Sequence, residues 1–158
     1  MSESASVGEL FSKAKEHGVI SPATAQVLNV PDMGAQIQAG LGLCVDDVNR
    51  DAVFLVTQQP DDSGSIRFAA GCSQAVRDGH NLVLEALLAS KASTGVLAMT
   101  QYLNGHILFP FCKLEDIVKM NSSNYDPKLG TPLYDNVVSL LGLVLAKAQE
   151  FADDGVQV

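Results

Sequence analysis

The sequence predicts an α/β fold of the doubly wound type, with three main strands and additional helices near the N-terminus. Residues 52–57 form a short apolar run, rich in β-branched and aromatic side chains, which is typical of a strand buried on both faces. A helical pattern over residues 72–90 separates this run from a second strand candidate at 95–103. Strands joined by a helical crossover are parallel and connected with a right hand. The order therefore predicts the first half of a doubly wound sheet, in which ligands bind at the carboxyl ends of the strands.

Residues 1–50 are predicted to form a helical extension in front of a partial α/β domain at residues 51–158. Residues 8–17 place their apolar side chains on one side and stop at a glycine, which is typical of a short helix. After a break at Pro31, apolar residues at 33, 37 and 41 return to helical spacing.

A hairpin follows the second strand. Asn104-Gly105 is a strong two-residue hairpin signal, so residues 106–111 are expected to form a third strand, antiparallel to the second. Pro110 lies within that strand, and proline cannot donate to a strand ladder. We therefore expect the third strand at an edge of the sheet, with a short helix over 114–120 after it.

The last element is a long helix. Thr131 is a good N-cap and Pro132 a good first helical residue. The pattern from Leu133 to Phe151 is apolar nearly all round. We expect this helix to be sandwiched between other elements rather than half exposed.

Composition excludes several classes of protein. The chain has 158 residues, of which 47% are hydrophobic and 18% charged, as expected for one folded domain. Its formal net charge of −8 disfavours nucleic acids and anionic membranes as partners. Its first residues lack the pattern of a secretory signal. The three cysteines, Cys44, Cys72 and Cys112, predict neither a disulfide framework nor a zinc site, so we expect reduced thiols in a cytoplasmic protein. The histidines at 17, 80 and 106 share no motif and are interpreted as surface or capping residues.

Two polar motifs carry the functional prediction. The first, Asp61-Asp62-Ser63-Gly64-Ser65, follows the first strand, and its alternate positions Asp61, Ser63 and Ser65 can turn toward one point because Gly64 permits a tight backbone. The second places Thr131 before the long helix and offers a third hydroxyl. Carboxylate and hydroxyl oxygens are hard ligands, suited to Mg²⁺, Mn²⁺ or Ca²⁺ rather than Zn²⁺.

Each motif alone also has a structural interpretation. Asp, Ser and Gly are the residues of any turn after a strand, and an N-cap role would occupy the hydroxyl of Thr131. Position, topology and the second loop together favour a metal site. We expect Asp61, Ser63, Ser65 and Thr131 to bind the ion, with Asp62, Asp126 and Asp135 as acceptors around those ligands.

On these residues the chain resembles the von Willebrand factor type A (VWA) domain family over about residues 52–158. Asp61, Ser63 and Ser65 match that family's Asp-x-Ser-x-Ser motif, and Thr131 matches its threonine before a later helix. The resemblance implies a metal-ion-dependent adhesion site, with Mg²⁺ or Mn²⁺ held partly through water. It also implies a binding module rather than an enzyme, whose partner protein completes the ion's coordination with an acidic residue.

The chain departs from that family in two ways. The family's last ligand is an aspartate, usually before glycine, at the end of a strand that would follow Val158. Asp126, Asp153 and Asp154 are nearby acidic residues, but none of them follows a predicted strand in this way. Residues 58–60 also interrupt the approach to the motif with polar residues and a proline. We expect the first strand to expose an unpaired hydrophobic edge, and the domain to be completed in trans by a second copy or by a chain carrying the other half. The alternative is a fragment, or an unusual minimal variant whose N-terminal helices cover the gap.

The sequence therefore predicts a metal-dependent protein–protein interaction module that assembles as a homo- or hetero-oligomer. One alternative is a structural assembly subunit that oligomerises through the exposed sheet edge, with a vestigial metal site. A metal-dependent phosphatase ranks last, because such a hydrolase needs a general base or a second metal, and the sequence offers no clear candidate for either.

Overall fold

The computed structural model describes residues 6–22, 24–25, 31–43, 48, 51–91, 93–128 and 132–158. In these residues it is a mixed α/β structure with a three-stranded sheet. The elements, in chain order, are α1 (Val7–Glu16), α3 (Pro31–Gly40), β1 (Phe54–Gln58), α4 (Gly64–Phe68), α5 (Cys72–Ala89), the 3₁₀ turn η2 (Ser93–Gly95), β2 (Val96–Gln101), β3 (Ile107–Lys113), the 3₁₀ turn η3 (Leu114–Asp116) and α6 (Leu133–Asp153).

The sheet has the strand order β1-β2-β3. β1 pairs with β2 in parallel, from Phe54 opposite Val96 to Gln58 opposite Thr100, and β2 pairs with β3 in antiparallel. The central strand β2 is buried along its whole length, whereas β1 is half-buried and begins with an exposed Phe54. The parallel pair, the antiparallel hairpin and the edge position of the strand that contains Pro110 confirm the predicted order.

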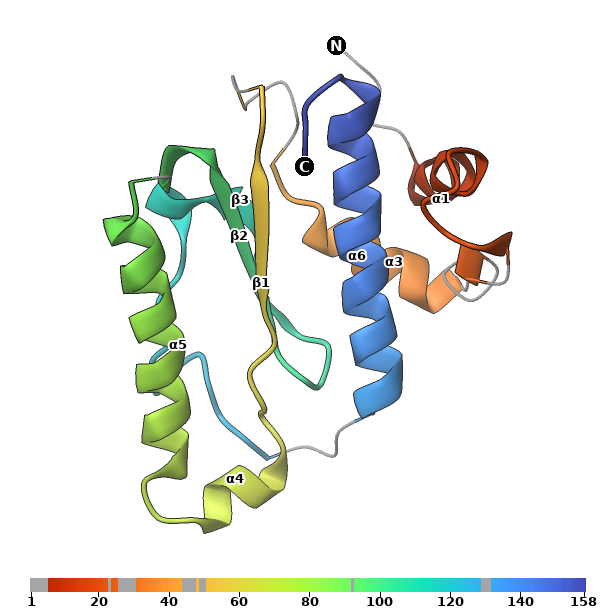
Figure 1. Cartoon of the computed structure of the whole chain (residues 1–158). Helices are drawn as coiled ribbons and strands as arrows, with labels where there is room; N and C mark the ends of the chain where they lie inside the picture. The colour runs from red at the N-terminus through yellow and green to blue at the C-terminus, as the bar shows by residue number, and fades with distance from the viewer. Residues whose placement is uncertain are drawn as a thin grey trace.

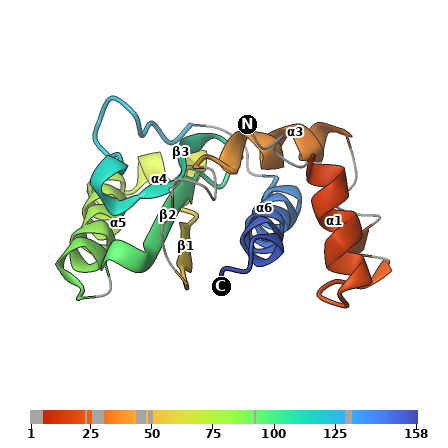
Figure 2. The same ribbon diagram turned by 90° about the horizontal axis from the view of Figure 1, so that it is seen from above.

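Helices cover both faces of the sheet. Figures 1 and 2 show α5 on one face and α6 on the other, with α1 on the far side of α6. The capping box between Ser6 and Glu9 defines the start of α1. An ion pair between Lys13 and Asp153, 2.6 Å long, ties α1 to the end of α6.

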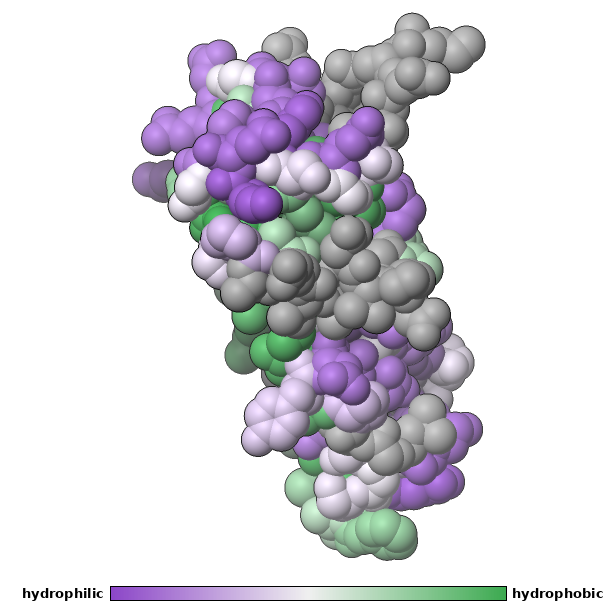
Figure 3. Space-filling model, turned by 90° about the vertical axis from the view of Figure 1, so that its right-hand side faces the viewer, coloured by the Kyte–Doolittle hydropathy of each residue, from purple (hydrophilic) through white to green (hydrophobic). Residues whose placement is uncertain are grey.

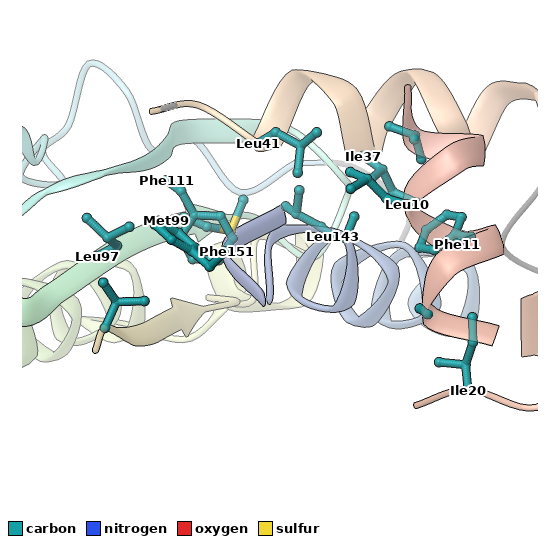
Figure 4. Packing of buried hydrophobic residues seen from close by; sticks show 14 residues of the cluster. Leu10, Phe11, Ile20, Ile37, Leu41, Leu97, Met99, Phe111, Leu143 and Phe151 are labelled. Carbon is teal, nitrogen blue, oxygen red and sulfur yellow. The ribbon is translucent and has the colours of Figure 1, made fainter. Parts of the chain in front are cut away.

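The main hydrophobic core joins the N-terminal helices to the sheet. It contains Leu10 and Phe11 of α1, Ile37 of α3, Leu143 of α6, and residues of β2 and β3 including Met99 (Figure 4). A second cluster lies between the sheet and α5 around Leu84 and Phe109. The helices of the predicted extension thus share one core with the sheet, while a domain boundary at residue 50 stays a prediction.

Three local predictions need correction. The helix expected over 114–120 is only the 3₁₀ turn Leu114–Asp116. The backbone becomes extended at Ile117, and the side chain of Asn81 forms hydrogen bonds with both the N–H and the C=O of Met120. Pro132 is the N-cap residue of α6 rather than its first helical residue, and the predicted N-cap, Thr131, lies outside the described residues. The loop after β1 contains a short helix, α4, that the sequence pattern does not indicate.

Candidate functional site

The loop after β1 carries the predicted ligands, and contacts from distant segments hold it in place. The N–H of Leu103 donates to the carbonyl oxygen of Pro60 over 3.0 Å, and the hydroxyl of Tyr125 donates to the carbonyl oxygen of Asp61. The N–H of Asn104 donates to the Asp62 carboxylate over 3.0 Å. The hairpin turn and the segment before α6 therefore fix the backbone from which Asp61 projects.

Two short hydrogen bonds link Asp61 to Ser63 and Ser63 to Ser65, while their convergence on one ion stays a prediction. The N–H of Ser63 donates to Oδ1 of Asp61 over 2.7 Å, and the hydroxyls of Ser63 and Ser65 share a hydrogen bond of 2.9 Å. α4 begins at Gly64 with Ser63 as its N-cap residue, and the Ser63 hydroxyl makes no capping bond. Both hydroxyls thus keep lone pairs that another ligand can use.

Asp62 bonds the hairpin turn. It is 4% exposed, and its carboxylate accepts the N–H of Asn104 in the hairpin turn. Burial raises the pKa of Asp62 above its ordinary value, and the neighbouring Asp61 adds to the rise. In this structure Asp62 fastens the turn to the loop, and its role beside a metal ion stays a prediction.

The start of α6 lies at the same end of the molecule. The side chain of Gln59 donates to the carbonyl oxygen of Asn136 over 3.2 Å, and the buried side chain of Asn136 donates to the carbonyl oxygen of Leu103 over 2.7 Å. Thr131 lies outside the described residues, so its distance from Asp61 stays untested. Pro132 and α6 follow it directly, which puts the described side of that loop next to the end of β1.

Gly105 explains how closely the hairpin turn and α6 approach each other. Its φ of +94° is readily adopted by glycine, and a Cβ atom built there would lie 2.7 Å from Oδ1 of Asn136. The Asn104-Gly105 motif, which the sequence identifies as a hairpin signal, therefore also permits the packing of this turn against α6.

The two other acidic residues named from the sequence are exposed. Asp126 pairs with Lys128, and this hydrogen bond lowers the pKa of the Asp126 carboxyl below its ordinary value. Asp135 lies in the first turn of α6, where a negative side chain is favoured by the helix dipole. In the part of the chain that the structure describes, neither carboxylate forms a hydrogen bond or ion pair with Asp61, Ser63 or Ser65, and their role around the ion stays a prediction.

Among the described residues, no group of three or more His, Cys, Asp and Glu side chains is arranged to hold a metal ion. The predicted ligand set contains one such residue, Asp61, together with hydroxyls. The binding of an ion by this set therefore stays a prediction.

Sequence reasoning missed the contacts of Asn104 and Asn136 around this loop. Tyr125 is buried, and its hydroxyl donates to the backbone carbonyl oxygen of Asp61. Burial, helped by the charges of Asp61 and Asp62, raises its pKa to about 12. These contacts join residues that are 33 to 77 positions apart, so no local pattern indicates them.

His80 corrects the expectation of a surface or capping histidine. Its ring is 4% exposed, and Nε2 lies 3.0 Å from the hydroxyl of Thr100 on β2. Burial lowers the pKa of His80 below its ordinary value. The residue packs between α5 and the sheet, edge-on to Phe109.

Comparison of the chain with models of known protein families, with curated proteins and with solved structures found no match in any of the three. In the described residues, no helix combines the length and apolar character needed to span a bilayer.

Proposed function

We propose that this protein is a VWA-like interaction module that docks a partner protein through a divalent cation. Asp61 supplies the negative charge, Ser63, Ser65 and Thr131 supply neutral oxygens, and Mg²⁺ is the ion that such ligands favour, with Mn²⁺ or Ca²⁺ as substitutes. A site with one carboxylate leaves the ion much of its positive charge. An acidic side chain of the partner would then fill an open coordination position.

The observation that supports this proposal is the pair of hydrogen bonds that link Asp61 to Ser63 and Ser63 to Ser65 just after the carboxyl end of β1. Ligands of α/β sheets bind at that end of the strands. Backbone and side-chain bonds from Leu103, Asn104 and Tyr125 hold the loop, so its oxygens are positioned before any ion arrives. A positioned ligand set loses less conformational freedom on binding than a free loop does.

The arrangement of elements supports a doubly wound sheet of the VWA type. A parallel pair, an antiparallel edge strand and helices on both faces agree with the first half of such a sheet. The bonds of Gln59 and Asn136 bring α6 to the Asp61 loop, as a shared site between the two loops requires.

Calorimetric titration with Mn²⁺ tests the metal site directly. Asp61→Ala removes the only carboxylate among the proposed ligands and should weaken Mn²⁺ binding by about tenfold or more, equivalent to about 1.4 kcal/mol or more. Asp116→Ala, which changes an exposed aspartate of η3, is the matched control and should bind Mn²⁺ like the wild type. Equal Mn²⁺ affinity in Asp61→Ala and the wild type would refute the proposed ligand set.

A second candidate function is an assembly subunit that associates through the edge of its sheet. The observation that favours it is the position of β1 at the end of the strand order, with no described strand beyond it along Phe54–Gln58. Association that persists in EDTA, together with unchanged behaviour of Asp61→Ala, would select this function over metal-dependent docking.

A further inference from the structure

Asn104 is the only asparagine of this chain that a glycine follows. In an Asn-Gly pair the glycine nitrogen can lose its proton and attack Cγ of the asparagine side chain. The attack forms a five-membered succinimide ring, and glycine has no side chain to obstruct it. The pair lies in the hairpin turn that bonds the loop carrying Asp61, so a change in its chemistry affects the candidate site.

The side chain of Asn104 is already held by the backbone of the turn. Its Oδ1 accepts the N–H of His106 over 2.8 Å. Negative charge develops on this oxygen when Cγ is attacked, and a hydrogen-bond donor at such a distance stabilises that charge. Asn104 is partly exposed, so the water and hydroxide that the reaction needs can reach it.

The structure beside the turn is also open to water. Figure 1 shows the turn between β2 and β3 close to the start of α6. Tyr134 in the first turn of that helix is 85% exposed, so α6 is not sandwiched along its whole length as the sequence predicted. In Figure 3 hydrophilic residues reach the surface at this end of the molecule. The turn therefore lies near solvent rather than within the core.

The reaction requires the turn to open locally. The N–H of Gly105 donates to the carbonyl oxygen of Tyr102 over 2.9 Å, and this bond must break before the nitrogen can lose its proton. The pairing of β2 with β3 is irregular near the turn, with register shifts on both sides of Thr100. Segments with few regular contacts open at a lower free-energy cost than the core of a sheet. Opening of the turn alone, with the sheet intact, is sufficient.

We propose that Asn104 is a site of spontaneous deamidation that releases the hairpin turn from the Asp61 loop. The Gly105 nitrogen gives its proton to hydroxide and bonds to Cγ, the bond from Cγ to the side-chain nitrogen breaks, and ammonia leaves with a proton taken from water. Water then opens the succinimide. Breaking the new bond gives aspartate at position 104, whereas breaking the original peptide bond gives isoaspartate, whose main chain runs through Cβ and Cγ.

The aspartate product places a second carboxylate beside Asp62. The Asp62 carboxylate accepts the backbone N–H of residue 104 over 3.0 Å, so the new carboxyl carbon, three bonds from that nitrogen, lies no more than about 7 Å from Oδ1 of Asp62. Asp62 is 4% exposed, so water and salt screen little of the repulsion between the two charges. The repulsion weakens the hydrogen bond that fastens the turn to the loop.

The isoaspartate product is too long for the turn. It adds one carbon to the main chain before Gly105, where a Cβ atom built on the glycine would already lie 2.7 Å from Oδ1 of Asn136. The extra atom displaces Asn136, whose side chain donates to the carbonyl oxygen of Leu103. Both products therefore loosen contacts that position Asp61. The modification itself needs no metal ion, so it stands apart from the proposed function.

Isotope labelling and a matched asparagine test the reaction. The full chain is kept in mildly alkaline H₂¹⁸O and then analysed by peptide mass spectrometry. Asn121 is the internal control, because its Oδ1 likewise accepts the N–H two residues on over 2.8 Å, but a serine follows it. Residue 104 should take up ¹⁸O several-fold faster than residue 121, as aspartate and isoaspartate. Equal or slower uptake at residue 104 would overturn the proposal.

Variants test the release of the turn. Asn104→Asp reproduces one product and should lower the urea midpoint of unfolding, whereas Asn121→Asp, the matched control, should leave it unchanged. Asp62→Asn keeps an oxygen that can accept the N–H of residue 104 but carries no charge. In that background Asn104→Asp should lower the midpoint by less than in the wild type. An equal loss in both backgrounds, or no loss in either, would contradict the release. Neither experiment uses a metal ion, so failure of the proposed metal site leaves both outcomes unchanged.

Discussion

Replacing Tyr125 with Phe tests whether the segment before α6 positions the Asp61 loop. Tyr125 is 2% exposed, and its hydroxyl donates to the carbonyl oxygen of Asp61. Its ring meets Tyr102 edge-on, with centroids 5.7 Å apart. Phenylalanine keeps this ring contact and removes only the hydroxyl, so the variant isolates one long-range hydrogen bond.

The expected loss of unfolding free energy is about 1 kcal/mol. A hydrogen bond between uncharged groups contributes about 0.5–1.5 kcal/mol net to stability. If its removal left a buried carbonyl without a hydrogen bond or water, the loss of unfolding free energy would be about 1–3 kcal/mol. Asp61 is half-buried, so water can reach its backbone and the lower figure applies. For a chain of this length the melting temperature should fall by about 2–4 °C.

The pH dependence provides a second measurement on the same variant. Burial raises the pKa of Tyr125 to about 12, above the ordinary value of 10.0. Between these values the unfolded chain releases its proton first, so the stabilisation is complete below pH 10 and is lost as the pH rises through about 12. Without a phenol at position 125, Tyr125→Phe should lose less stability over this interval than the wild type.

Urea denaturation followed by circular dichroism measures both effects. Tyr134→Phe is the matched control, because it removes the same hydroxyl from a side chain that is 85% exposed. This variant should unfold like the wild type. If Tyr125→Phe also unfolds like the wild type at neutral pH, the hydroxyl does not hold the loop, and the argument for a positioned Asp61 fails.

Two further predictions concern buried polar groups. Burial lowers the pKa of His80 below 6.5, so on acidification the unfolded chain protonates this imidazole before the folded chain does. Urea titrations should therefore show the free energy of unfolding falling as the pH drops below 6.5. His80→Gln should reduce this dependence of stability on pH. Lys147 is buried, with its Nζ donating to the carbonyl oxygen of Leu43 and, over 2.9 Å, to the Glu150 carboxylate. Lys147→Met should lower the free energy of unfolding by about 2 kcal/mol, and adding Glu150→Gln should restore part of that loss. A double variant no more stable than Lys147→Met would contradict the pairing of Lys147 with Glu150.

The order of the strands could be predicted because it depends on local patterns. The apolar run at 52–57, the turn at Asn104-Gly105 and the proline at 110 each determine one feature of the sheet, and the structure shows all three. The helix predicted over 114–120 was wrong for a non-local reason. The Asn81 side chain, from α5, bonds the backbone of Met120 and stabilises an extended segment there.

The candidate site was predictable only where its residues are neighbours in sequence. Alternation places Asp61, Ser63 and Ser65 within one loop, and the structure links them in sequence through two hydrogen bonds. The residues that hold the loop are distant in sequence, and hydrogen bonding alone relates them to it. The burial of His80 did have a signal, since it lies four residues before the fully buried Leu84 on the same face of α5.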